Sequence, residues 1–122
     1  MLSYTVYKLF HILGMLLVFV AAGGAAVHAA AGGDKEANPL RRGLVIAHGV
    51  GLVLLLVAGF GMLARIGASA ASGWVFGKLA IWLIMGASTV LPYKVRGLAG
   101  AMLSLLPLLG ALAAYLALYK PF

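Results

Sequence analysis

The sequence predicts an all-α fold, in which residues 1–122 form a single domain, an up-down bundle of four transmembrane helices. Three observations support this prediction. The composition is 65% hydrophobic, and the mean hydropathy of +1.14 is far above that of a soluble domain of this size. Four long apolar runs occupy almost the whole chain. The only two carboxylates, Asp34 and Glu36, lie together in one short polar loop.

The apolar runs cover residues 9–31, 43–64, 74–91 and 98–119. In an α-helix, about 20 apolar residues cross the roughly 30 Å hydrocarbon layer of a bilayer. Each run meets or approaches this length. With their flanking helix signals, we expect the four spans at about 4–32, 40–67, 73–93 and 97–119, which leaves no room for a soluble domain.

Glycine and proline set the ends of the first two expected helices. The Gly32-Gly33 pair ends the first helix, because glycine reaches the left-handed conformation without strain. Pro39 can open the second helix, which ends near Arg65. The small residues of segment 67–73 then make a short turn.

Residues typical of the membrane surface lie at the ends of the last two expected helices. Trp74 opens the third helix at the membrane surface, and Pro92-Tyr93 ends it. A tight loop, residues 94–97, leads into the fourth helix, where Pro107 should cause a kink. An aromatic and basic anchor follows at the end: Tyr115, Tyr119, Lys120 and Phe122.

The charge and the missing residue types exclude several functions. Nine Lys and Arg residues against two acids give a net charge of +7, but they lie at helix ends, where they face lipid headgroups. We therefore expect no nucleic-acid partner. The lack of cysteine excludes disulfides, thiolate metal sites and thiol catalysis. No acid lies within a span, which excludes a proton-coupled antiporter.

The basic residues also predict how the bundle is oriented. One side of the membrane receives both expected loops and most of the basic residues: Lys35, Arg41, Arg42, Lys94 and Arg96. The positive-inside rule places this side in the cytoplasm and both termini outside. We expect an integral protein of a bacterial inner membrane, in contact with the lipid bilayer.

Four ionisable residues in the spans are candidate functional residues: His11, His28, His48 and Lys78. Placing a Lys in a span costs about 2.5–3.5 kcal/mol on insertion scales, so such a residue suggests a function. Because the first two helices are antiparallel, we expect His28 and His48 at one level near the basic loops. We expect His11 and Lys78 at the level near the termini.

These histidines and Lys78 suggest a site for haem b within the bundle. Imidazole is a strong axial ligand for haem iron, and helix bundles hold porphyrins between facing side chains. Either His28 with His48, or His11 with Lys78 or Met62, would bind the iron. A His28 and His48 pair would place four basic residues where the haem propionates emerge: Arg41, Arg42, Lys94 and Arg96.

Each candidate also has a structural interpretation. Lys78 is near a helix end and can extend to the headgroups. His28 can be an interfacial residue at a helix terminus, and His48 can donate a hydrogen bond to a carbonyl of a neighbouring helix. Small residues four apart, such as Ala47 and Gly51, favour close packing within the bundle, or alternatively against a partner or a flat cofactor.

Three short motifs carry a family resemblance. The segment Lys8-Leu9-Phe10-His11 resembles the K-x-x-H start of the SirB family, and Gly73-Trp74-Val75-Phe76-Gly77-Lys78-Leu79 resembles its G-W-x-x-x-K-L third helix. The stretch from Arg42 to His48 is similar to its second helix. The same His and Lys recur in the HemJ protoporphyrinogen oxidases and, more loosely, in CopD-like membrane proteins.

The resemblance implies a four-helix bundle in which His11, His48 and Lys78 are the matching positions. In HemJ-like proteins the corresponding His and Lys are tied to haem binding and to oxidation of a porphyrinogen. This chain has shorter loops and lacks the later polar cluster of their third helix. We therefore expect that it is not an enzyme by itself.

Two functional hypotheses follow. The first is a redox module that holds a b-type haem or associates with a quinone, alone or inside a larger membrane complex. The second is a non-catalytic accessory subunit that packs against larger membrane proteins. In both cases we expect other membrane subunits, or further copies of the chain, as partners.

Overall fold

The computed structural model describes residues 2–122, and this part of the chain consists of helices joined by turns and loops, without a β-strand. Five α-helices follow one another: α1 (Tyr4–Ala30), α2 (Arg41–Ile66), α3 (Gly73–Gly86), α4 (Leu91–Lys94) and α5 (Met102–Tyr119). Two short 3-10 turns, Lys35–Ala37 and Arg96–Leu98, lie in the connections. The predicted all-α class is confirmed.

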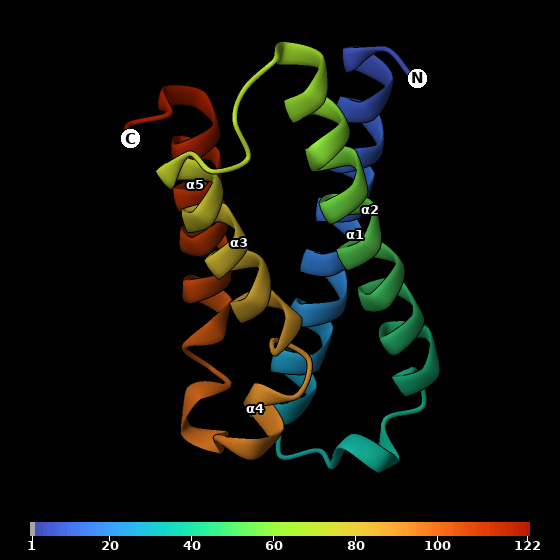
Figure 1. Ribbon diagram of the computed structural model, residues 1–122. Helices are drawn as coiled ribbons and strands as arrows, with labels where there is room; N and C mark the ends of the chain where they lie inside the picture. The colour runs from blue at the N-terminus through green and yellow to red at the C-terminus, as the bar shows by residue number, and fades with distance from the viewer. Residues whose placement is uncertain (1) are drawn as a thin grey trace.

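The helices form two antiparallel pairs (Figure 1). α1 and α2 make a long hairpin, and α3 and α5 make a second pair beside it. Both chain termini lie at one end of the molecule, and the α1–α2 connection and α4 lie at the other end. Three helices, α1, α2 and α5, are long and apolar enough to cross a membrane.

Two glycines set the close packing of the α1–α2 hairpin. A methyl group added at Gly51 would lie 2.7 Å from the Gly14 carbonyl oxygen, and one added at Gly14 would lie 2.8 Å from the Gly51 carbonyl oxygen. Only hydrogen fits at these distances, so the two backbones can approach closely, as small residues allow in membrane helices. Gly51 therefore serves packing within the bundle, as the first of its two interpretations predicted.

The core lies where α1 meets the α3–α5 pair. It is made of eight buried side chains from these three helices: Val18, Ala22, Ala26, Ile81, Met85, Met102, Leu106 and Leu116. The alanines of α1 leave room for the longer Leu, Ile and Met side chains of the second pair. Interdigitation of this kind holds the two pairs together through dispersion contacts.

The third apolar run does not form the single helix predicted over residues 73–93. α3 ends at Gly86, a turn follows at residues 87–90, and α4 begins at Leu91. Pro92 explains the break, because a continuous helix would need an N–H at residue 92 for the Ser88 carbonyl, and the proline ring would clash with that carbonyl. With its 14 residues, α3 is about 21 Å long and too short to cross a bilayer alone.

The other boundaries agree more closely with the sequence. α1 and α2 begin and end within two residues of the predicted spans 4–32 and 40–67. Gly32 and Gly67, with φ of +88° and +68°, follow these two helices in the left-handed conformation. The last helix begins at Met102 instead of residue 97, because turns occupy the residues in between, and Pro107 lies inside it.

Replacing Pro92 by Ala should extend helical structure across the break between α3 and α4. The restored N–H at residue 92 can bond to the Ser88 carbonyl, and the ring clash is removed. We expect slower amide hydrogen exchange at residues 89–92 in detergent micelles, with Pro39→Ala in the exposed loop as the control. Unchanged exchange at these amides would mean that Pro92 does not cause the break.

Candidate functional site

The contacts between α1 and α2 determine the level of each polar residue along the hairpin. Gly14 lies opposite Gly51, which fixes the register of the two antiparallel helices. This register, with the contact of Gly24 and Leu44, puts His48 at the level of residues 17–20 of α1, which are about 8–11 residues, or roughly 12–16 Å, along α1 from His28. His28 and His48 therefore do not share the level that the sequence predicted.

His48 connects α2 to the end of α3. It is buried, and its Nε2 donates a 2.8 Å hydrogen bond to the Met85 carbonyl, since a carbonyl can only accept. The hydroxyl of buried Ser88 donates to the same carbonyl over 2.5 Å. Because α3 stops at Gly86, the Met85 carbonyl has no donor four residues further along a helix. It accepts instead from the Ser88 N–H over 3.1 Å and from these two side chains. The structural interpretation of His48 is confirmed.

His11 forms a similar tie between α1 and α2. Its Nδ1 donates to the Leu55 carbonyl over 3.1 Å. One turn away on α2, the Leu52 carbonyl accepts a 3.0 Å hydrogen bond from the indole N–H of Trp82 on α3. Lys78 lies one turn before Trp82 on α3, which runs antiparallel to α2, and therefore near the level of Leu55 and His11. The structure thus brings His11 and Lys78 to one level, as the sequence predicted.

The third histidine belongs to a group that we call the loop cluster: His28, Asp34, Asn38, Tyr93 and Arg96. A 2.6 Å hydrogen bond joins His28 Nδ1 and the Tyr93 hydroxyl, and the amide of Asn38 donates to this hydroxyl over 3.5 Å. The Arg96 guanidinium lies 5.4 Å from the centroid of the Tyr93 ring. It also forms an ion pair with Asp34 at 3.3 Å.

Arg96 gives the loop cluster its position at the end of α1. Its Nη1 donates to the Gly33 carbonyl over 2.6 Å and to the Ala29 carbonyl over 3.4 Å, which satisfies carbonyls at the helix C-terminus. From the sequence, Arg96 is expected among the basic residues that set the topology or face haem propionates, and Tyr93 only at a helix end. No local pattern joins them to His28, because His28 and Tyr93 are 65 residues apart in the chain.

No hydrogen bond joins Arg41 or Arg42 to a histidine within residues 2–122. Both arginines are exposed in the first turn of α2, where they border an open surface hollow of about 500 Å³ together with Val45 and Ile46. No histidine lines this hollow. The placement of haem propionates beside these arginines stays a prediction.

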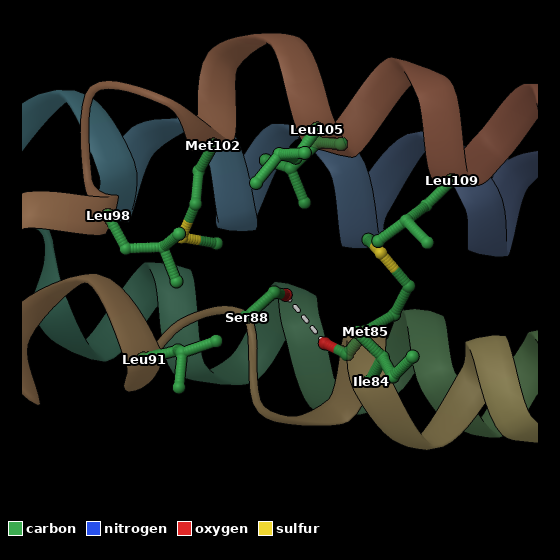
Figure 2. Close-up of a pocket in the computed structure, with 9 residues that line it drawn as sticks. Ile84, Met85, Ser88, Leu91, Leu98, Met102, Leu105 and Leu109 are labelled. Carbon is green, nitrogen blue, oxygen red and sulfur yellow. Dashed lines mark hydrogen bonds between the residues drawn. The ribbon is translucent and has the colours of Figure 1, made fainter. Parts of the chain in front are cut away.

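The cavity between α3 and α5 is small, and no histidine lines it. Across residues 2–122, no group of three or more His, Cys, Asp or Glu side chains could hold a metal ion. The cavity between α3 and α5 measures about 70 Å³, far below the roughly 300–1,000 Å³ of typical ligand pockets. Figure 2 shows its walls: Met85, Ser88 and Leu91 face Met102, Leu105 and Leu109, and these side chains are apolar apart from Ser88.

Comparison with protein-family models, with curated proteins and with solved structures gave no match. The resemblance to the SirB family, and the more distant one to HemJ and CopD-like proteins, stays a prediction.

Proposed function

We propose that this chain is a small integral membrane protein that serves as a non-catalytic subunit of a larger membrane assembly. One observation carries the proposal: each of the three histidines is hydrogen-bonded to a group elsewhere in the same chain. The imidazoles therefore connect helices and loops to one another. Hydrogen bonds between helices explain why the chain keeps polar side chains in apolar helices, although placing them there costs free energy. No catalytic role is needed to account for them.

The surface of the bundle supports a place inside the bilayer. Windows of 18 residues in α1, α2 and α5 have mean hydropathies of 2.2, 2.3 and 1.9. Large apolar side chains cover the outside of the bundle, and Val20 and Leu118, for example, are 68% and 77% exposed. Apolar surface of this extent is unfavourable in water and favourable against lipid tails.

The proposed topology has four membrane crossings, of which the third is a broken one. α3, the turn at 87–90 and α4 together lead from the end of the bundle that holds the termini to the opposite end (Figure 1). Both termini then lie on the same side of the membrane. The basic residues near the opposite end favour the cytoplasm for that end, which places both termini outside a bacterial inner membrane.

The redox hypothesis, with haem b or a quinone, has one observation in its favour. Iron-binding histidines usually donate their second ring N–H to a backbone carbonyl. His11 makes such a bond through Nδ1 to Leu55, and Nε2 has no hydrogen bond within the described chain. Gly59 adds no side chain beside this imidazole, since a methyl group there would come within 3.4 Å of the ring. His11 is therefore the best remaining candidate for an iron ligand.

An absorption spectrum of the purified protein separates the two hypotheses. For a non-catalytic subunit, the reduced-minus-oxidised difference spectrum should show no Soret band. The opposite result is a Soret band that His11→Ala abolishes and that His28→Ala, a matched change in the same helix, leaves intact. It would replace the accessory role by a haem site at His11.

A further inference from the structure

The break between α3 and α4 leaves backbone groups without partners. The Ser88 carbonyl would bond to the N–H of residue 92 in a helix, and Pro92 has none. Within the described chain, the Gly86 carbonyl accepts no hydrogen bond, and neither the N–H nor the hydroxyl of Thr89 has a partner. The segment 86–89 thus presents both free acceptors and free donors.

This segment lies near the middle of the bundle. The end of α3 is level with the middle of α1, because Met85 is bonded to His48, which lies at the level of residues 17–20 of α1. Val18 is close to the centre of α1, which runs from Tyr4 to Ala30. In the proposed topology, which this inference presupposes, the free backbone groups are therefore at the depth of the hydrocarbon core.

The outer side of the break is uncovered in the single chain. Gly86 and Ala87 are exposed and Thr89 is half-buried, whereas Ser88 turns inward to the Met85 carbonyl. In a bilayer, non-helical backbone at this depth occurs only where protein or a water-filled cavity covers it, since lipid tails offer no hydrogen bonds. The chain by itself would place the Gly86 carbonyl and the polar groups of Thr89 against lipid.

We propose that a second copy of this chain covers the face formed by Gly86, Ala87 and Thr89, related to the first by a two-fold axis. A two-fold interface brings the same patch of both copies together, so the patch must be complementary to itself. Segment 86–89 meets this condition, because the donors of Thr89 in one copy can bond to the Gly86 carbonyl of the other. The small residues Gly86 and Ala87 permit the close approach that these bonds need.

The flanking side chains suit such an interface. Leu83 and Ile84, in the last turn of α3, are 66% and 49% exposed. They form an apolar border beside the polar segment, which is the pattern in which buried hydrogen bonds between membrane helices are shielded. No charged side chain lies in residues 83–90, so two copies can meet there without repulsion.

Cysteine crosslinking tests this proposal directly, because the chain has no cysteine of its own. We would introduce Ala87→Cys, or Leu83→Cys one turn earlier, and oxidise membranes that contain the full chain with copper-phenanthroline. Val20→Cys is the matched control: it is 68% exposed and near the same level, but on α1. We expect a disulfide-linked dimer from Ala87→Cys or Leu83→Cys at a yield at least tenfold above that of Val20→Cys.

Two other outcomes would contradict the proposal that a second copy of the chain covers the break. If neither variant forms a dimer and a water-soluble thiol reagent modifies Ala87→Cys, a water-filled cavity covers the break. If neither forms a dimer and the reagent fails to react, a different protein covers it. Carbonate extraction of the same membranes separates this failure from that of the proposed function, since a chain released by carbonate is not an integral membrane protein.

Discussion

Replacing Gly51 by Leu should lower the free energy of unfolding of the bundle by about 3 kcal/mol, the upper part of the usual range for overpacking. Already the Cβ would lie 2.7 Å from the Gly14 carbonyl oxygen and 2.7 Å from Val18 Cγ2. The first of these atoms is backbone, which cannot move aside as the end of a side chain can. The α1–α2 hairpin therefore has to separate to admit the Leu. Unfolding in detergent, followed by the fluorescence of Trp82 at the α2–α3 contact, measures the loss.

Gly49 provides the control for this change. It lies two residues before Gly51 in the same helix, and a Cβ added there meets no atom within 4 Å. Gly49→Leu should leave stability unchanged or raise it slightly, because Leu has the higher helix propensity. Equal losses from Gly49→Leu and Gly51→Leu would show that the close contact between α1 and α2 does not stabilise the protein.

Replacing His48 by Leu should lower the free energy of unfolding by about 1–2 kcal/mol, as for loss of a buried hydrogen bond between membrane helices. Leu fills a similar volume but cannot donate to the Met85 carbonyl, which then keeps only Ser88 as its side-chain donor. Combining His48→Leu with Ser88→Ala should cost more than the sum of the two single changes, since the carbonyl then loses both side-chain donors.

Amide hydrogen exchange around the turn at 87–90 provides a second measurement for His48. His48→Leu should accelerate exchange at residues 86–91, because the α3 end loses its tie to α2. Ser104→Ala, at an exposed position of α5, is the control and should have little effect. If the His48→Leu variant has the same free energy of unfolding and the same amide exchange rates as the wild type, the hydrogen bond to Met85 does not stabilise the protein.

The long elements of this fold follow from the sequence because their signals are local. The apolar runs and terminal glycines fix α1 and α2 to within two residues. The broken third helix was missed because Pro92 acts on a carbonyl four residues before it. Ser88 and Thr89 therefore appeared to be ordinary helix residues, and Pro92 appeared only to end the helix.

The polar contacts were harder to predict because they depend on register. The equal depth assigned to His28 and His48 came from counting residues from helix ends. The actual levels are set by the contact between Gly14 and Gly51, which no spacing in the sequence specifies. The hydrogen bond from His48 to a carbonyl of a neighbouring helix was one of the predicted alternatives, and only the structure identifies Met85 as the acceptor.

Native mass spectrometry of the assembly released from its membrane in mild detergent is the most direct test of the proposed role. We expect a mass that equals whole polypeptide subunits, including at least two copies of this 12.6 kDa chain, with no added mass of a haem. A single chain, or a mass that includes one haem for each chain, would contradict the account of a non-catalytic subunit whose histidines serve only to tie the helices together.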